Sequence, residues 1–184
     1  TLLKQTVKTL ERNRPPEKYP WSTVCDDKKI IKSDNIILCT ALGTNNLLKN
    51  LNHEIPMEPI LGQAFEIETN KKRLQSWPGV ISTKNYNLIP TAENKLLIGA
   101  TIENSLLPKE INFNNMRTLN GLAPTWISQG DIKSKWYGLR ARPLGTSSPV
   151  LEEIEKGLIV ATCHYRNGVL LAPATAEWVG EKVT

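Results

Sequence analysis

Residues 157–179 read GLIVATCHYRNGVLLAPATAEWV, and this stretch predicts a strand, a polar turn and a helix in that order. Residues 158–161 are apolar without a break, which is typical of a strand buried on both faces. Residues 164–168 are polar and end in a glycine, and helix formers follow. Pro173 fits a first helical turn, so we expect the helix to begin close by, near Gly168. The turn should therefore lie at the carboxyl end of a buried strand, where open α/β sheets bind ligands.

The polar turn has two interpretations. A helix that follows a buried strand offers unpaired N–H groups and a partial positive charge at its start. Gly168 would let the backbone approach a flat ligand, with His164, Tyr165 and Arg166 at the mouth of a cleft. In the alternative, the segment is an ordinary surface turn, in which His164 bonds to the backbone and Arg166 is solvated.

The remaining chain predicts an α+β fold. Leu3, Val7 and Leu10 have helical spacing and predict an N-terminal helix, and DNIILCT (34–40) followed by ALGTNNLLKNL (41–51) predicts a strand covered on both faces and then a helix. The next hundred residues alternate or form hairpins, with a turn at 91–94, one helix within 112–124 and a strand over 131–143. The three glutamates before Gly157 read as a solvated turn. We expect a largely antiparallel sheet with helices, flanked by partial α/β segments.

The strand 131–143, DIKSKWYGLRARP, points to a binding site. Side chains alternate along a strand, so Trp136, Arg140 and Arg142 share one side. If Trp136 faces the interior, Arg140 does too, and a buried guanidinium needs an anion. Its planar fork suits a carboxylate. Two alternatives remain open: a structural salt bridge to a nearby acidic residue, or an exposed Trp136 with both arginines reaching into water.

The composition excludes several classes of protein. The 184 residues carry a net charge of +5, but lysines and arginines alternate with acids and form no basic stripe, which argues against a nucleic-acid binder. No apolar run is long enough to span a bilayer, and the start is no secretory signal. Cys25, Cys39 and Cys163 are odd in number; we expect Cys39 and Cys163 to be buried reduced thiols and the protein to be cytoplasmic. His53 reads as incidental, and no residues have metal-ligand spacing.

Five stretches together carry a family resemblance. They are WYGLRARP (136–143), ATCHYRNGVLLAPATAEWV (161–179), DNIILCTALGTNNLL (34–48), EPILGQAF (58–65) and NLIPTAENKLLIGATIE (87–103). In their order along the chain they resemble the closing third of the FAD-dependent oxidases of the D-amino-acid oxidase family, especially the glycine oxidases. In that family the arginine of the Gly-Leu-Arg strand holds the substrate carboxylate, and the His-Tyr-Arg-Asn-Gly loop lies against the flavin.

The resemblance implies a set of site residues. The substrate-binding residues would be Arg140, Arg166, Asn87, Tyr86 and His164. The FAD-binding residues would be Thr40, Ala41, Gly43, Cys163, His164, Tyr165, Arg166, Asn167, Gly168, Val169 and Leu170. No side chain is implied as a catalytic acid or base, and no metal is implied.

Several positions depart from the family pattern. Cys163 and Ala41 replace glycines, Leu61 replaces an arginine, residues 141–143 interpose Ala-Arg before the proline, and Asn87 stands where the family has a carboxylate-binding tyrosine. These changes make a substrate other than glycine plausible.

No two of the 11 glycines are two residues apart, so the Gly-x-Gly-x-x-Gly turn that binds the FAD pyrophosphate in the family has no place in this sequence. We therefore expect a carboxyl-terminal fragment that is inactive by itself and needs a missing N-terminal FAD-binding segment. The expected parts are a helix and linker over 1–20, a partial FAD-binding lobe over 21–54, a substrate-binding sheet lobe over 55–143, and the end of the FAD-binding lobe over 144–184.

The chemistry that the resemblance implies is hydride transfer from the α-carbon of an amino acid or amine to flavin N5. Oxygen or another electron acceptor would then reoxidise FAD, and a homo-oligomer is left open. A different hypothesis is a non-catalytic binding or assembly domain that keeps the fold without the cofactor.

Overall fold

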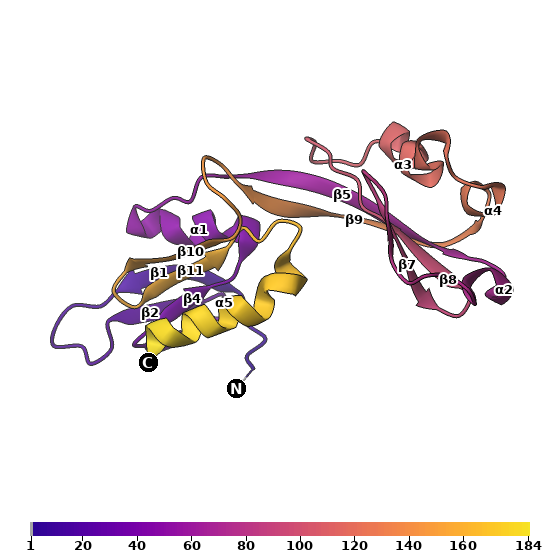
Figure 1. The fold of residues 1–184 in the computed structure, drawn as a ribbon. Helices are drawn as coiled ribbons and strands as arrows, with labels where there is room; N and C mark the ends of the chain where they lie inside the picture. The colour runs from indigo at the N-terminus through magenta and orange to yellow at the C-terminus, as the bar shows by residue number, and fades with distance from the viewer. Residues whose placement is uncertain (1) are drawn as a thin grey trace. The chain divides into compact units, whose positions relative to one another are not determined.

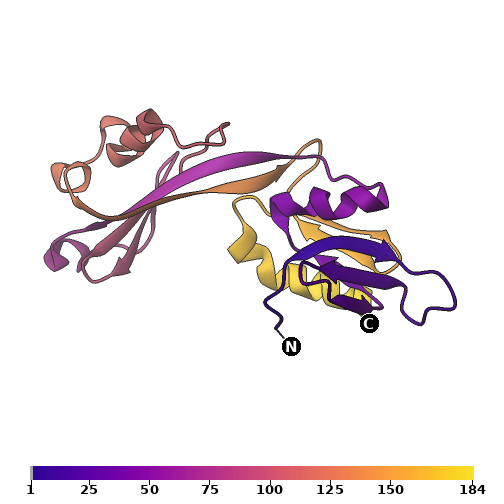
Figure 2. The same ribbon diagram turned by 180° about the vertical axis from the view of Figure 1, so that it is seen from behind.

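The computed structural model describes residues 2–184, which divide into two compact units (Figures 1 and 2). Unit 1 comprises the residues up to Glu58 together with 141–184, and unit 2 comprises Pro59–Arg140. The fold is the predicted α+β class, with antiparallel sheets and few helices. Among the described residues, no helix has the length and hydropathy needed to cross a membrane.

Unit 1 contains two three-stranded sheets. β1 (Val7–Arg12), β2 (Trp21–Cys25) and β3 (Ile30–Ser33) form an antiparallel sheet, and the second sheet has the order β10-β11-β4. In that sheet β10 (Val150–Glu155) is antiparallel to β11 (Leu158–Thr162), and β11 is parallel to β4 (Ile36–Leu38). After β4 come a 3-10 turn (Ala41–Gly43), α1 (Thr44–Leu48) and a second 3-10 turn (Lys49–Leu51). The unit ends in α5 (Gly168–Val183).

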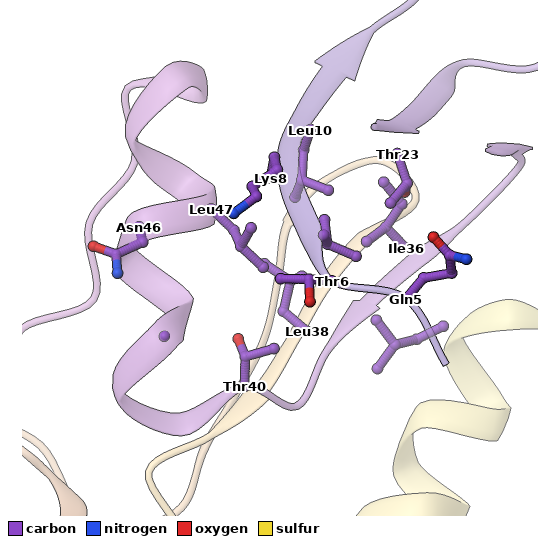
Figure 3. Close-up of a pocket in the computed structure, with 13 residues that line it drawn as sticks. Gln5, Thr6, Lys8, Leu10, Thr23, Ile36, Leu38, Thr40, Asn46 and Leu47 are labelled. Atoms are coloured by element: carbon purple, nitrogen blue, oxygen red, sulfur yellow. The ribbon is translucent and has the colours of Figure 1, made fainter. Parts of the chain in front are cut away.

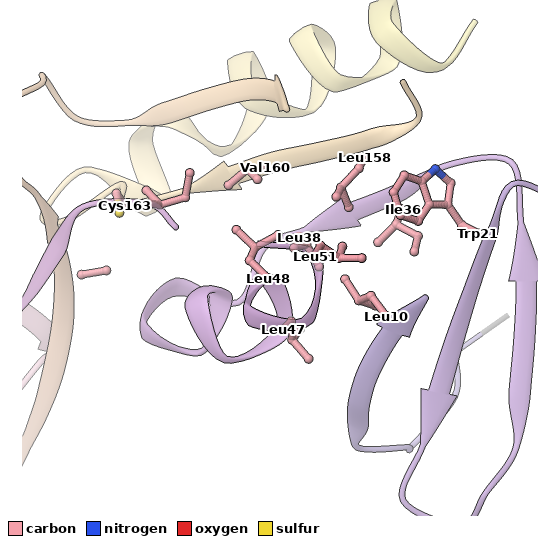
Figure 4. Packing of buried hydrophobic residues seen from close by; sticks show 12 residues of the cluster. Leu10, Trp21, Ile36, Leu38, Leu47, Leu48, Leu51, Leu158, Val160 and Cys163 are labelled. Carbon is pink, nitrogen blue, oxygen red and sulfur yellow. The ribbon is translucent and has the colours of Figure 1, made fainter. Parts of the chain in front are cut away.

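The core of unit 1 lies on one face of the parallel strand pair. Leu158 and Val160 of β11 are fully buried and pack with Leu38 of β4 and with Leu48 and Leu51 of the helical segment (Figure 4). Alternate residues face the other side, where α5 lies. The predicted strand, turn and helix over 157–179 are confirmed, because β11 is buried along its whole length and α5 begins at Gly168.

The predicted N-terminal helix through Leu3, Val7 and Leu10 is wrong, because Val7–Arg12 is a strand. The register explains the error. Val7 pairs with Cys25, but Thr9 already pairs with Val24, so β1 holds an extra residue at this point. Such a bulge reverses the alternation, and Val7 and Leu10 then face the same side. Their three-residue spacing resembles that of a helix although the backbone is extended.

Three further expectations in unit 1 need correction. β4 is not covered on both faces by the described residues, since Ile37 is 40% exposed. Cys39, expected to be buried, is exposed, whereas Cys25 and Cys163 are buried; all three are free thiols. The glutamates of residues 152–155 do not form a turn but belong to β10, and Glu155 binds both Arg12 and His53.

Unit 2 is built on a five-stranded sheet with the order β6-β7-β8-β5-β9. Its strands are β5 (Met57–Glu68), β6 (Ile81–Ser82), β7 (Asn87–Ala92), β8 (Lys95–Gly99) and β9 (Asp131–Pro143). The predicted hairpin is present, with β7 and β8 antiparallel on either side of residues 93–94. The helical elements are α2 (Lys71–Leu74), α3 (Glu110–Arg117), a 3-10 turn (Leu119–Gly121) and α4 (Thr125–Ser128).

One face of the unit 2 sheet is covered and the other is open. Phe65 and Ile67 of β5 and Ile98 of β8 pack against Phe113 of α3 and Ile127 of α4. The residues between them, such as Ala64, Glu66 and Leu97, are only partly buried. The predicted alternation is present over residues 63–68, and among the described residues no helix covers the second face of the sheet.

Candidate functional site

The polar turn of unit 1 has a strained backbone that several contacts hold in place. Cys163 and Tyr165 have φ values of 55° and 54°, in a region that is unusual for residues with side chains and is maintained only by surrounding contacts. The Ser148 hydroxyl donates to the Cys163 carbonyl, and the amide of Asn167 donates to the His164 carbonyl. The His164 ring shares a 2.8 Å hydrogen bond with Thr175 of α5. The backbone of the turn is therefore held by defined contacts, although Arg166 and Asn167 within it are exposed.

The start of α5 is open and apolar. No side chain caps its first N–H groups, and its first turn has no acidic residue. Val169 and Leu170 are 95% and 79% exposed there. Free amides beside exposed apolar side chains suit a flat ligand with an electron-rich edge. Pro173 lies in the second turn rather than the first, because the helix already begins at Gly168.

A hollow of about 740 Å³ lies between β1, β4 and α1 (Figure 3). Of the predicted FAD-binding residues it is lined by Thr40 and Gly43, while Ala41, with a φ of 46°, starts the 3-10 turn between them. Its other lining residues come mostly from β1, β4 and the residues before β1. They include Thr6, Val7, Lys8, Ile36, Ile37 and Asn46.

A second hollow, of about 630 Å³, lies on the α5 side of the same sheet. Ile37 and Cys39, at the end of β4, meet a line of small residues of α5 across it: Gly168, Ala172, Ala176 and Gly180. His164 also borders this hollow. Ile37 lines both hollows, and β4 pairs with β11 along only one of its edges in the described part of the chain. An edge of a parallel sheet is usually covered.

The cysteines near these hollows are not suited to nucleophilic catalysis. Burial raises the pKa of the Cys163 thiol, and the partial loss of solvent around the sulfur raises the pKa of the Cys39 thiol although the residue is exposed. Both are therefore protonated near neutral pH, and a protonated thiol is a poor nucleophile.

The open face of unit 2 carries Arg140 and Asn87. In the sheet register, Asn87 pairs with Gly99, and Gly99 pairs with Ala64, so these three residues form one row on the open face. Gly62 lies two residues before Ala64 and faces the same side. The Arg140 guanidinium lies over it, because a Cβ added at Gly62 would be 1.6 Å from Arg140 Nη2. The arginine thus lies beside a floor of glycine and alanine, which leaves room for a small ligand.

A backbone carbonyl orients the Arg140 side chain, and the inward-facing position expected if Trp136 is buried is not observed. Its Nη2 donates a 2.7 Å hydrogen bond to the Thr101 carbonyl. Trp136 is 46% exposed, so the condition that it faces the interior is not met. The second alternative is also incomplete, since Arg142 binds Glu58 instead of reaching only into water.

Tyr86 lies on the opposite face from Asn87. It is buried within the cluster beneath α3, where burial raises the pKa of its phenol. The predicted substrate residues are thus separated, with Asn87 and Arg140 on the open face and Tyr86 behind it. In unit 1, Arg166 and Asn167 of the turn are exposed, and His164 and Tyr165 are partly buried.

The sequence analysis missed residues that act through their neighbours. Gly62 makes room for Arg140, while Ser148, Thr175 and Glu58 each bind a residue of the turn or of β9. The glycine of Leu-Gly-Gln was visible as part of a motif, but its role depends on which strand lies beside it. The other three residues have no sequence signal, because each contact joins segments far apart in the chain.

The comparisons with known proteins decide the family. A family model described as "DAO: FAD dependent oxidoreductase" matches residues 2–182. The chain belongs to this family. The family assignment confirms the resemblance found in the sequence, and it agrees with the uncapped helix start and the open face around Arg140.

Several curated proteins are similar to this chain. It is 26% identical over 161 residues to a glycine oxidase of Pseudomonas putida, covering 84% of this chain and 43% of the relative. It is 30% identical over 165 residues to the bifunctional protein ThiO/ThiG of a Nostoc species, covering 84% and 24% respectively. The chain therefore spans less than half the length of these relatives.

Solved structures share the fold. The glycine oxidase of Geobacillus kaustophilus superposes with a TM-score of 0.79 at 21% identity, covering 97% of this chain and 48% of that one. The L-proline dehydrogenase of P. horikoshii gives a TM-score of 0.78 at 23% identity, covering 98% and 49%. At these identities the likeness establishes the shared fold of the DAO family.

Proposed function

We propose that this chain is part of an FAD-dependent oxidoreductase of amino acids or amines, similar to the glycine oxidases. Unit 1 would be the part of the FAD-binding lobe that this chain contributes, and unit 2 would be the substrate-binding lobe. The observation that carries the proposal is the position of Arg140. Its guanidinium lies over Gly62 on the open face of the sheet, and Asn87 lies on the same face. A guanidinium beside a floor without large side chains is a ready site for a small carboxylate.

The residues of unit 1 fit a bound FAD. The uncapped start of α5 offers N–H groups, and Val169 and Leu170 offer apolar surface beside them. The hollow that Thr40 and Gly43 line would take the extended part of the dinucleotide. We propose that a segment outside this chain completes the site by covering the free edge of β4 and supplying the phosphate-binding glycines. The missing turn of that type in the sequence supports this view.

In the proposed mechanism the side chains bind and orient, and none acts as a strong base. Arg140 holds the substrate carboxylate by two hydrogen bonds, so that the α-hydrogen has one direction, and Asn87 donates from the same face. Bound FAD would supply the two-electron acceptor that takes the α-hydride at its N5 atom. The positive end of the α5 dipole would stabilise negative charge that develops on a group bound beside Gly168. The substrate amino group first loses a proton to solvent. Loss of the α-hydride then leaves an imine, which water hydrolyses.

The proposal requires Arg140 to bind the substrate carboxylate. The test is Arg140→Ala in the full gene product, assayed with a panel of amino acids and N-methyl amino acids under oxygen. We expect kcat/KM to fall by at least about a hundredfold, as loss of an orienting charged contact implies. Bound FAD and the melting temperature should stay near those of the wild type.

The matched control is Arg117→Ala, which removes another arginine of unit 2 that bonds a backbone carbonyl, here that of Ser128. Its kcat/KM should match the wild type. Turnover that survives Arg140→Ala together with a loss of stability would support a purely structural arginine. A full gene product without bound FAD or turnover would support the non-catalytic binding domain instead. Hydrogen peroxide in the assay distinguishes oxygen from another electron acceptor.

A further inference from the structure

Arg142 lies between a carboxylate and the polar turn of unit 1. Its Nε and Nη2 donate hydrogen bonds of 2.8 and 2.6 Å to the same oxygen of Glu58. The guanidinium also hydrogen-bonds the phenol of Tyr165, and Glu58 and Tyr165 together raise the pKa of Arg142. The three side chains come from β5, β9 and the turn, and all belong to unit 1.

The ion pair is poorly placed to stabilise the fold. The side chains of Arg142 and Glu58 are 34% and 36% exposed, and solvent screens ion pairs of this kind. Two donors on one oxygen do, however, restrict the orientation of the guanidinium plane. The pair therefore does more to aim the remaining N–H groups of Arg142 than to hold the unit together.

Arg142 contacts Tyr165, a residue of the turn that has a strained backbone. Tyr165 has a φ of 54°, which a bulky side chain rarely adopts unless contacts maintain it. Two neighbouring residues of the turn already have side-chain partners: Ser148 binds the Cys163 carbonyl, and Thr175 binds the His164 ring. Arg142 provides the corresponding contact for Tyr165. It is also one of the two residues that this chain inserts between the Gly-Leu-Arg segment and Pro143.

We propose that Arg142, oriented by Glu58, is a positioning residue that holds Tyr165 and thereby fixes residues 164–168 against the flavin ring. This inference rests on the proposed function, because the turn is assigned to the flavin only there. It implies that loss of Arg142 changes the environment of the flavin rather than the stability of the fold. It also implies that Arg142 and Tyr165 act as a coupled pair.

The test uses Arg142→Met, Tyr165→Phe and the double variant in the full gene product. Hydrogen exchange of peptides covering residues 163–170 is measured on the flavin-free protein, and the visible spectrum and reduction potential are measured on the flavin-loaded protein. We expect each single variant to speed exchange in these peptides about fivefold, the factor that one net hydrogen bond implies. Each should also shift the flavin absorption maxima and potential. The double variant should add little to either single change.

The control is Arg12→Met, which breaks the Arg12–Glu155 pair elsewhere in unit 1. It should leave exchange in residues 163–170 and the flavin spectrum unchanged, even where it lowers the melting temperature. Additive effects of the two substitutions, or an unchanged turn and spectrum in Arg142→Met, contradict the inference while FAD binding persists. A wild-type protein that takes up no FAD contradicts the proposed function itself, and the flavin part of the inference fails with it.

Discussion

At the scale of single residues, Gly62 determines where the Arg140 side chain can lie. A Cβ at this position would overlap Nη2 at 1.6 Å and the guanidinium carbon at 2.6 Å. Gly62→Ala should therefore push the guanidinium off the sheet without creating backbone strain elsewhere. We expect the affinity for acetate, measured by the perturbation of the flavin spectrum in the full gene product, to fall at least about tenfold, as loss of a charged hydrogen bond implies.

The control for this substitution is Gly138→Ala in β9, since nothing lies within 4 Å of a Cβ added there. Its acetate affinity should equal that of the wild type. Equal affinities for all three proteins would mean that the guanidinium does not bind the carboxylate from its position over Gly62.

The sequence could indicate Arg140 but not Gly62. An arginine after Gly-Leu in an alternating strand is visible in one segment of sequence. The overlap with Gly62 exists only because β9 lies beside β5, and no local pattern specifies that neighbour. The same reason explains why Glu58 and Thr175 were missed, while the turn residues that they help to hold were predicted.

At the scale of elements, local patterns were reliable where the backbone is regular. The apolar run of β11 and the polar turn after it define strand, turn and helix within 30 residues, and all three are present. β1 was misread because its bulge gives apolar residues the spacing of a helix. β10 was misread because its glutamates face solvent or Arg12, so it has no apolar alternation.

Glu103 ties the loop after β8 to β5 and gives a prediction at this scale. It is buried, and its carboxylate accepts hydrogen bonds from the Thr101 hydroxyl, the Gln63 amide and the Lys109 backbone N–H. Burial alone would raise its pKa, but these hydrogen bonds outweigh burial and lower it. Glu103→Gln should lower the free energy of unfolding by about 1–3 kcal/mol at pH 7, measured by urea denaturation.

The pH dependence follows from the direction of that pKa. Because the folded-state pKa of Glu103 lies below its unfolded value of about 4.3, its contribution is present above that pH. The contribution is lost as the pH falls through the folded-state pKa. The wild type should therefore lose stability more steeply than Glu103→Gln in this acid range. Glu110→Gln, which removes an exposed partner of Lys135, is the control and should follow the wild type.

At the scale of the whole molecule, the parallel strand pair of unit 1 has a partly exposed strand, β4. Ile37 is exposed, both hollows meet at β4, and small residues line the facing side of α5. Parallel sheets are normally covered on both faces. The chain spans less than half the length of the relatives that it matches, and the segment proposed above would cover this side. In the sequence, the only sign of such a segment is that the chain has no Gly-x-Gly-x-x-Gly turn.

Cys39 reports whether β4 is covered. In the 184-residue chain it is exposed, whereas Cys25 and Cys163 are buried, so a thiol reagent should modify one cysteine rapidly and two slowly. The labelling rate should keep rising with pH beyond the usual pKa of a cysteine thiol, because partial loss of solvent around the sulfur raises the pKa of Cys39. In the full gene product with FAD, the covering segment should slow this reaction by more than about tenfold, as burial from the reagent implies. Cys39→Ser identifies the rapid site. Equal rapid labelling of Cys39 in the short chain and in the flavin-loaded protein would show that β4 keeps a free edge, and the cofactor would then have to bind without a strand beside it.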